Sequence, residues 1–501
     1  MSNQNYGNYN NMPSPDLGTP QPAPYYYEQP TTQPYEEVTT TTTTTVNPIL
    51  KNRKFLIIGL IVFGVILLII LLLSLTSRRP STTGNNTNTN TQNVSLQFRG
   101  AFIPSEAMQP LLDDYKALNP NVTIEYADKW PDGPYKDASA IYKSEINRVL
   151  RENDSVNIPD IYMVNNSWVG DYEKYAKSST NMDYQTFNSI FYPAASQDFA
   201  NDGTNVYGVP LWMDTLAILY NQDILASKSI SEPSKNWVEF KKQAQTLTTK
   251  EGGQIKVAGF AAGNLDNVSY GFELTNILLL QNGVEMISGS TKQVSFATFS
   301  EAAPAIQYFQ SFQTDSNSTW NKTMQNDAAA FLEGKAAMIA STSYRYRDIL
   351  KYNKNYNIRL NIGVSQIPQI TGQSQPIINF ADYWGAMVSD ARGNSRAAWD
   401  FLKWLTQPEQ LRKLSENIAT ETESFGILYP RKDMAQILQT DPDLAVFNES
   451  LPYAQSWYMV NGTKVRELFQ TLLSAGGNAS QAQITQLQND VQTILTNKGK
   501  I

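Results

Sequence analysis

Residues 94–126 of this 501-residue chain read VSLQFRGAFIPSEAMQPLLDDYKALNPNVTIEY, and this stretch sets the fold class of the segments that follow. It begins with a strand-like segment, Val94–Phe98, and continues into an amphipathic segment whose apolar side chains recur at helical spacing as far as Leu118. An Asn-Pro pair ends that helix, and Val122–Tyr126 then alternates apolar and polar residues as a strand does. We therefore predict a strand, a helix and a second strand in succession.

The same alternation continues beyond this stretch. A polar helix is expected over Ala138–Arg151, and the apolar segment Ile158–Val164 is expected to be the next strand. Strands that alternate with helices pair in parallel through right-handed crossovers, which predicts an α/β fold. Further helices are expected over Thr275–Leu280, Ala328–Phe331 and Arg396–Leu405. In the last of these Trp399 and Trp404 lie at helical spacing among Leu and Phe, so we expect them in the core.

An apolar run, Phe55–Leu75, divides the chain into a short tail and a large body. Its 21 residues contain no charge, and at ~1.5 Å per residue they span the ~30 Å hydrocarbon core of a bilayer. Three basic residues precede the run and two follow it, so 51–79 is predicted to be a transmembrane helix with basic flanks. The run continues into SLTSRRP rather than a small-residue cleavage site. We therefore predict an uncleaved signal-anchor in the cell membrane, with the tail cytoplasmic and the body extracellular.

The segments on either side of the run differ sharply in composition. Residues 1–50 hold eight Pro and no Lys or Arg, which predicts a disordered cytoplasmic tail. Residues 80–93, PSTTGNNTNTNTQN, are predicted to be a polar linker. The body, 94–501, is large enough for two lobes at ~100–200 residues per domain.

Composition removes several classes of function. The chain has no Cys and no His, which excludes disulfides, a lipid-modified cysteine, a thiol nucleophile, a His-based triad and a typical zinc site. We expect no catalytic residue, no metal and no cofactor. The net charge of −7 argues against a nucleic-acid partner. Glycosidase chemistry with paired carboxylates remains open on composition alone.

Five segments of the body carry a family resemblance. They are VYGVPLWMDTLAILYNQDIL at Val206–Leu225, AFLEGKAAM at Ala330–Met338, the PDI strand at Ile158–Ile161, ADYWGAMV at Ala381–Val388 and SFGILYP at Ser424–Pro430. In this order and spacing they resemble the extracellular solute-binding protein family 1, the maltose-type receptors of ABC importers. The resemblance extends over the whole body.

The resemblance implies a two-lobed periplasmic-binding-protein-like fold of type II behind the single transmembrane helix. Lobe 1 is expected at about 94–209 and 375–420, and lobe 2 at about 210–364 and 425–501. Hinge strands would join two α/β lobes that close on a small-molecule solute. The implied partners are a sugar-like solute, the subunits of an ABC permease and the membrane through Phe55–Leu75, with the body itself a monomer.

Carried over position by position, the resemblance also implies a ligand site. Aromatic faces would stack on the C–H faces of a sugar ring, and carboxylates and amides would bind its hydroxyls. Asp214 replaces an acidic cleft residue, or is a hinge ion-pair residue, and Tyr344 replaces a stacking Trp. The side chains of Trp168 and Trp384 belong either to the cleft or to the core. The expected ligand-binding residues are Asp214, Tyr344, Trp212, Trp168, Asn166, Asp382, Trp384 and Trp457.

One departure from the family concerns the ligand itself. After the first strand, two polar sugar contacts of the maltose-type proteins are replaced by Ala101 and Phe102, which counts against a maltodextrin. We expect a membrane-tethered extracellular receptor that delivers a carbohydrate or related polar solute to an ABC importer. The alternative is a sensory or adhesive receptor with the same fold and no transport role. An enzyme is not expected, because a retaining glycosidase needs two cleft carboxylates ~5 Å apart and only Asp214 is placed there, with Asp382 a weaker second.

Overall fold

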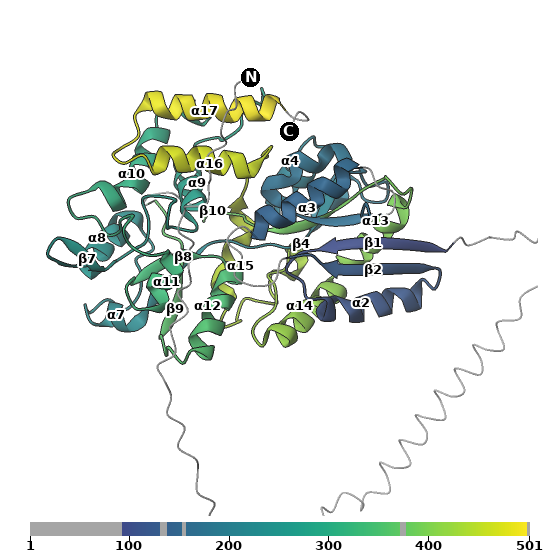
Figure 1. Cartoon of the computed structure of the whole chain (residues 1–501), viewed down its shortest axis with the longest axis horizontal. Helices are drawn as coiled ribbons and strands as arrows, with labels where there is room; N and C mark the ends of the chain where they lie inside the picture. Colours follow the sequence, from purple (N-terminus) through teal and green to yellow (C-terminus); the bar gives the residue numbers. More distant parts are fainter. Residues whose placement is uncertain (1–92, 131–137, 153–156, 371–376, 498–501) are drawn as a thin grey trace, which may run out of the picture. The chain divides into compact units, whose positions relative to one another are not determined.

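Strands and helices alternate from Val94 onward in a computed structural model that describes residues 93–130, 138–152, 157–370 and 377–497 (Figure 1). The first five elements occur in the predicted order and within a few residues of the predicted bounds. They are β1 (Val94–Gly100), α2 (Ser105–Leu118), β2 (Val122–Asp128), α3 (Ala138–Glu152) and β3 (Ile161–Asn165). The α/β class predicted from the hydrophobic pattern is therefore confirmed.

The predicted membrane anchor is not among the residues that the structure describes. The tail 1–50, the segment Phe55–Leu75 and nearly all of the linker 80–93 lie outside them. Across the described parts of the chain, which belong to one compact unit beginning at Gln92, we find no helix that is both long and apolar enough to cross a bilayer.

Lobe 1 is built on a five-stranded sheet with the order β2-β1-β3-β11-β4. The first three strands pair in parallel, as predicted. In contrast, β11 (Trp384–Val388) is antiparallel to β3 and to β4 (Gly208–Trp212), because the chain leaves this lobe through β4 and returns to it through β11. The helices of this lobe are α2, α3, α4 (Val169–Tyr172), α5 (Tyr184–Ile190), α6 (Pro193–Phe199), α13 (Ser395–Leu405) and α14 (Pro408–Thr422).

Lobe 2 is built on a smaller, antiparallel sheet. Its central strand β5 (Ala217–Asn221) pairs with β8 (Met338–Ser341) and β9 (Ile362–Gln366). A short hairpin, β6 (Thr249–Glu251) and β7 (Gln254–Val257), forms a separate two-stranded sheet. The helices of lobe 2 are α7 (Gln222–Ala226), α8 (Trp237–Leu247), α9 (Gly271–Gln281), α10 (Ala302–Thr314), α11 (Asp327–Leu332), α12 (Ser343–Asn355), α16 (Gly462–Leu473) and α17 (Gln481–Thr496).

Three segments of the chain cross between the lobes and lie side by side. The first is 213–216, between β4 and β5. The second runs from β10 (Asn379–Phe380) into β11, and the third runs from β12 (Ala454–Gln455) to α16. Strands β10 and β12 pair in parallel, and a β-bridge between Thr215 and Ala381 joins the first crossing to the second. These hydrogen bonds hold the crossings together as a hinge.

The last boundary between the lobes lies later than predicted. We expected residues from 425 onward in lobe 2, but Arg431 forms a β-bridge with Phe191 and its guanidinium donates to the Thr406 carbonyl, 3.0 Å away. The backbone N–H of Met213 also donates to the carbonyl of Leu428. Residues 428–431 therefore belong with lobe 1, because their backbone completes hydrogen bonds at the edge of that lobe. The short helix α15 (Ala445–Ser450) precedes the third crossing.

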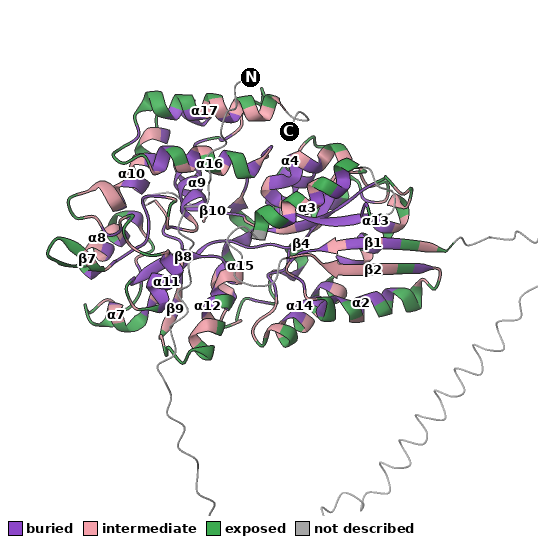
Figure 2. Ribbon diagram, in the orientation of Figure 1, coloured by how far each residue is buried: buried purple, intermediate pink, exposed green. Residues whose placement is uncertain are grey.

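The core of lobe 1 depends on the amphipathic faces of its helices. Figure 2 shows α2 buried on one face and exposed on the other, as its periodicity predicts. In α13, Trp399 and Leu402 are fully buried against the sheet, and the Trp399 indole donates to the carbonyl of Lys177 at 2.9 Å. Trp404 is only partly buried and packs at the edge of the same core.

Truncation of a buried residue of α13 should destabilise lobe 1. We expect Leu402→Ala to lower the free energy of unfolding by about 2–5 kcal/mol, because it removes apolar contacts and leaves a cavity. Arg396→Gln is the matched control, since Arg396 is exposed on the same helix and should change stability by less than about 0.5 kcal/mol. Urea unfolding followed by tryptophan fluorescence measures both, and equal losses would contradict this account of the core.

Candidate functional site

Asp214 lies at the first crossing between the lobes, where its carboxylate is buried. Its Oδ1 accepts hydrogen bonds from the backbone N–H groups of Thr215 at 2.8 Å and Ser343 at 3.0 Å. Its Oδ2 accepts from the Ser343 hydroxyl at 2.7 Å and from the Tyr344 N–H at 3.1 Å. A carboxylate has about four lone-pair sites, so protein donors occupy all of them. Asp214 therefore ties the hinge to the start of α12.

The first turn of α12 presents Tyr344 toward the space between the lobes. Thr342 caps the helix, since its hydroxyl oxygen accepts from the Arg345 N–H at 3.4 Å. The guanidinium of Arg347 lies over the Tyr344 ring, 4.8 Å from its centroid, and donates to the carbonyl of Phe425 at 3.4 Å. Asp214 on one side and Arg347 on the other thus fix the orientation of the Tyr344 ring.

Six aromatic side chains from both lobes meet at this point. We call them the cleft aromatic cluster. Its members are Phe102, Trp130, Trp168, Trp212, Tyr344 and Trp384. Five come from lobe 1 and only Tyr344 comes from lobe 2. The cluster includes four of the predicted site residues, and Phe102 and Trp130 are members that the sequence did not indicate.

Phe102 is at the centre of the cleft aromatic cluster. Its ring centroid is 3.7 Å from that of Trp130, 4.9 Å from Trp384 and 5.0 Å from Tyr344. Its φ of 64° lies in the left-handed region, where a side chain with a Cβ is strained. The strained backbone after β1 therefore directs an aromatic ring into the place where the family resemblance had suggested a lost polar contact.

The cavity beside Phe102 is nearly filled by these rings. It is lined by Phe102, Trp212 and Asp214, together with the α12 residues Ser343, Tyr344 and Arg347, and its volume is about 20 Å³. That is room for one water molecule and not for a sugar ring. A sugar ring would fit here only if the Phe102 and Tyr344 rings separated, and because they belong to different lobes this would require the lobes to part.

The second predicted carboxylate, Asp382, has a different environment. Its Oδ1 accepts from the Asn165 side-chain amide at 2.8 Å, and none of the described residues donates a hydrogen bond to its Oδ2. Burial, together with the nearby carboxylate of Glu273, raises the pKa of Asp382 to about 6, against the lowering effects of the Asn165 hydrogen bond and of Arg466. Burial likewise raises the pKa of Asp214 to about 7 against its hydrogen bonds. Asp382 is therefore the carboxylate with acceptor capacity left for a solute hydroxyl.

Next to Asp382, lobe 2 contributes charged groups that the sequence did not reveal as a set. Arg466 of α16 forms an ion pair with the buried Glu273 of α9. The Tyr270 hydroxyl is 2.7 Å from the Thr342 hydroxyl, and the Arg345 guanidinium lies 5.6 Å from the Tyr270 ring. Only the tertiary fold brings α9, α12 and α16 together, so no local sequence signal identifies this arrangement.

Asn166 is placed in the hinge rather than toward the cleft. Its buried amide donates to Asp198 at 3.2 Å and to the carbonyl of Ala381 at 3.3 Å. The hydroxyls of Tyr383 and Ser456 each donate to the same Asp198 oxygen at 2.7 Å. Since Tyr383 lies in the second crossing and Ser456 in the third, Asp198 links both to α6 of lobe 1. Burial raises the pKa of Asp198 to about 6, against the hydrogen bonds that lower it.

Trp457 lies apart from the cleft aromatic cluster. Its indole donates to the Asn276 side chain at 2.8 Å, and its ring packs in the core of lobe 2 with Met459 and Val465. The predicted site is thus divided by the structure. Trp212, Trp384 and Tyr344 meet in the cleft with Trp168, whereas Asn166 and Trp457 do not face it.

The arrangement is suited to holding a polar molecule with apolar faces. It combines aromatic rings, one carboxylate with an open oxygen and amide groups, between two lobes that a hinge joins. Within the described ranges, no group of three or more Asp, Glu, His or Cys side chains is placed to hold a metal ion.

Comparison with known proteins identifies the family. A family model described as bacterial extracellular solute-binding protein matches residues 111–437, more than half of the chain. The resemblance to extracellular solute-binding proteins that the five motifs indicate is thereby confirmed.

Solved structures share the two-lobed fold. The cyclic α-maltosyl-1,6-maltose binding protein of Arthrobacter globiformis superposes with a TM-score of 0.62 at 18% identity, over 80% of this chain and 99% of that protein. The sugar-binding protein MalE of Xanthomonas citri gives 0.61 at 18% identity, over 80% and 98%. The GacH receptor of Streptomyces glaucescens, solved with and without acarbose, gives 0.59 at 18% identity, over 81% and 99%. At this identity the likeness establishes the fold.

The buried Asp198 should make stability depend on pH. Its ordinary pKa of 3.8 rises to about 6 in the folded protein, so between these values the folded state holds a proton that the unfolded state releases. The free energy of unfolding should therefore fall as pH increases from about 4 to about 6, by at most about 1.4 kcal/mol per pH unit. Asp198→Asn cannot titrate and should lose this part of the slope. Urea unfolding at a series of pH values measures it, and parallel pH profiles for the two proteins would contradict the assignment.

Proposed function

We propose, because the chain belongs to the family of bacterial extracellular solute-binding proteins, that it captures a carbohydrate or related polar solute outside the cell and delivers it to an ABC importer. In this proposal the body is not an enzyme. It binds the solute between its lobes, and the closed form is what the permease recognises. The proposal extends to a single-pass tether through Phe55–Leu75 with the N-terminus in the cytoplasm.

The contact between Phe102 and Tyr344 carries the proposal. It joins aromatic rings from the two lobes across the cleft, at 5.0 Å between centroids. Such a pair contributes about 0.5–1.5 kcal/mol beyond the area it buries. Opening the cleft loses that contact and exposes both rings, and the C–H face of a sugar ring can cover them again. A solute that stacks on both rings therefore replaces the contact between them and allows the lobes to close around it.

Polar groups at the rim of the cluster supply specificity for hydroxyls. The open Oδ2 of Asp382 accepts hydrogen bonds, and Asn165, beside it, fixes the position of that carboxylate. A hydrogen bond to a charged acceptor is stronger than one between neutral groups. Proteins of the same fold have been solved with cycloalternan, acarbose and maltotetraose. These ligands support a saccharide as the class of solute.

Hinge closure supplies the signal for delivery. Asp214 and Asp198 hold the crossings to both lobes, so a solute that binds both faces shifts the population toward the closed form. A permease that contacts both lobes then distinguishes the loaded receptor from the empty one. The apolar run near the N-terminus would keep the receptor beside that permease, since a chain without Cys has no cysteine that could carry a lipid anchor.

Removal of the Tyr344 ring should weaken solute binding. We expect Tyr344→Ala to reduce saccharide affinity by about 1–2 kcal/mol, roughly ten-fold, because the stacking face on lobe 2 is lost. Tyr356→Ala is the matched control, because Tyr356 is 51% exposed at the C-terminal end of the same helix. A thermal-shift screen of residues 94–501 against neutral and acidic saccharides identifies a ligand, and calorimetry then compares the variants. Equal affinities for Tyr344→Ala and wild type would remove Tyr344 from the site.

Separation of the body from the N-terminal segments should change location and leave binding intact. We expect the full chain to sediment with membranes, and a chain that begins at Val94 to remain in the supernatant with the same saccharide affinity, since the described lobes are built without residues 1–92. Ultracentrifugation followed by calorimetry tests this. A full chain that stays in the supernatant would contradict the tether, and a soluble fragment that binds no saccharide would contradict the receptor.

A further inference from the structure

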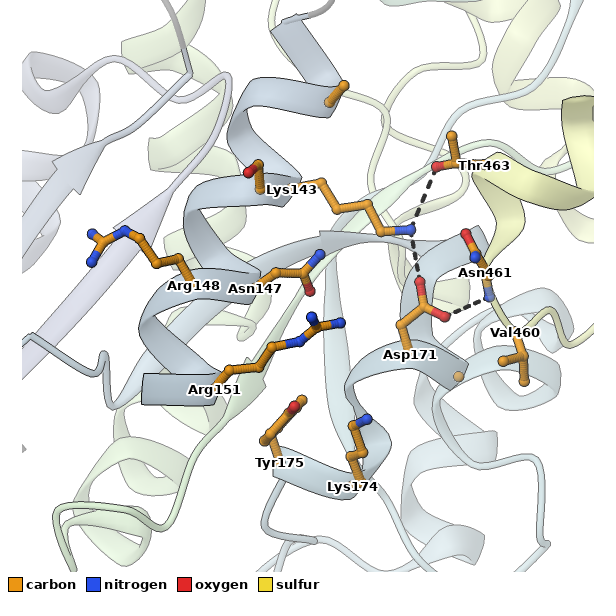
Figure 3. A pocket seen from close by; sticks show the side chains of 13 residues that line it. Lys143, Asn147, Arg148, Arg151, Asp171, Lys174, Tyr175, Val460, Asn461 and Thr463 are labelled. Atoms are coloured by element: carbon orange, nitrogen blue, oxygen red, sulfur yellow. Dashed lines mark hydrogen bonds and ion pairs between the residues drawn. The ribbon is translucent and has the colours of Figure 1, made fainter. Parts of the chain in front are cut away.

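A cation-rich pocket lies beside the hinge, next to Trp168 of the cleft aromatic cluster. The volume of this pocket is about 480 Å³. Its wall is formed by α3 and α4 of lobe 1 and by residues 460–463 at the start of α16 (Figure 3). We call it the basic pocket. Four cationic side chains and one carboxylate line it, and these are Lys143, Arg148, Arg151, Lys174 and Asp171. This excess of positive charge is local, because the chain as a whole has a net charge of −7.

Two glycines bring the two lobes into close contact around this pocket. A Cβ on Gly462 of α16 would lie 2.4 Å from the carbonyl oxygen of Ser167, and a Cβ on Gly170 of α4 would lie 2.3 Å from the carbonyl oxygen of Met459. Side chains at these positions would therefore force the backbones apart. The basic pocket exists in this form only while the start of α16 is seated against lobe 1.

The one carboxylate of the pocket is already engaged. The Oδ2 of Asp171 lies 2.7 Å from the amine of Lys143, and its Oδ1 accepts the backbone N–H of Asn461. Lys143 also donates to the Thr463 hydroxyl at 3.4 Å. Asp171 therefore neutralises Lys143 and fixes the seat of α16, and among the described residues it forms no ion pair with Arg151.

Arg151 is the cation that faces the open part of the pocket. Figure 3 shows its guanidinium extending from α3 toward Asp171, beside Asn147, while Arg148 extends away from that space. Among the residues that the structure describes, no carboxylate lies within ion-pair distance of Arg151, whereas Arg148 pairs with Glu152 at 2.9 Å. Lys174, with its amine 5.1 Å from the Tyr175 ring, lies on the opposite wall.

The basic pocket is connected to the solute cleft through aromatic contacts. The amine of Lys143 lies over the ring of Trp168, 5.1 Å from its centroid. The Trp168 ring is 5.0 Å from that of Trp384, which in turn lies 4.9 Å from Phe102. A solute that stacks along this row reaches the basic pocket at its far end.

We propose that the basic pocket binds an anionic group, a carboxylate, sulfate or phosphate, through Arg151 and Lys174. The fork of guanidinium N–H groups matches the paired oxygens of such a group. The first turn of α16, a helix of 12 residues, adds the positive end of its dipole from lobe 2. An anion there contacts both lobes and so favours the closed hinge. The group belongs either to an acidic solute or to a free anion, and the assignment to a solute rests on the proposed function.

The first experiment uses inorganic phosphate as the probe of the pocket itself. Thermal unfolding of the full chain is measured with increasing sodium phosphate against sodium chloride of equal ionic strength, because a ligand of the folded state raises the transition temperature by mass action. We expect phosphate to stabilise the wild type. The double variant Arg151→Gln, Lys174→Gln should lose about ten-fold in phosphate affinity, the scale of losing charge-assisted hydrogen bonds. Arg396→Gln removes one exposed cation elsewhere on lobe 1 and should respond as the wild type does.

The second experiment identifies the source of the anion. Calorimetry compares a uronic-acid disaccharide with its neutral parent disaccharide, for the wild type and for the double variant. Tighter binding of the acidic sugar, lost in the variant while the neutral sugar is unaffected, would assign the pocket to the solute. A response to phosphate together with equal affinity for both sugars would assign it to a free anion.

The proposal is overturned if neither phosphate nor the acidic sugar distinguishes the wild type from the double variant. The transition temperature of the double variant without added anion shows whether it is folded, and both substituted side chains are at the surface. Failure of the proposed function is a separate result. If no saccharide binds while phosphate still stabilises the wild type and not the variant, the pocket remains an anion site and the carbohydrate receptor is refuted.

Discussion

The four hydrogen bonds accepted by Asp214 are the constraint on which the site depends. The chain leaves the sheet of lobe 1 at Trp212 and enters that of lobe 2 at Ala217, and within this crossing one buried carboxylate binds the first turn of α12. Burial of a charged group is unfavourable unless its lone pairs are satisfied, and here protein donors satisfy them. The position of the Tyr344 ring follows from this attachment, and so does the closure of the cleft against Phe102.

A second buried carboxylate, Asp198, acts on the other crossings. It accepts hydrogen bonds from Tyr383 and Ser456, which lie at the second and third crossings, while belonging itself to α6 of lobe 1. The hinge is thus held at two points, and each of them joins segments that are far apart in sequence. The aromatic rings between them have apolar faces and few polar partners, so they can exchange contact with each other for contact with a solute. Rigid crossings and exchangeable ring contacts are what a receptor needs to close on a ligand.

The sequence predicted those features that local pattern determines. The periodicity of residues 94–126 gave the right elements of lobe 1, because burial of one face imposes it on each helix and strand. The antiparallel pairing of β11 with β3 and β4 was not predictable, since it depends on where the chain crosses between the lobes. Asp214 was predicted either to contact the ligand or to form a hinge ion pair. The structure places it at the first crossing, and its hydrogen bonds with Ser343, 129 residues away, were not predictable from the sequence. Phe102 was missed because its role follows from a backbone φ of 64°. Trp457 was predicted to bind the ligand but packs in the core of lobe 2, because its motif does not determine which face the ring takes.

The central claim, that the lobes close on a saccharide, is tested most directly by a distance between them. The chain has no native Cys, so Leu118→Cys in α2 and Val238→Cys in α8, both exposed, accept spin labels without competing sites. Double electron–electron resonance then gives the distribution of distances between the two lobes. We predict a broad distribution without ligand that becomes a single, shorter distance with saturating saccharide. An unchanged distribution, with calorimetry showing the saccharide bound, would contradict the account.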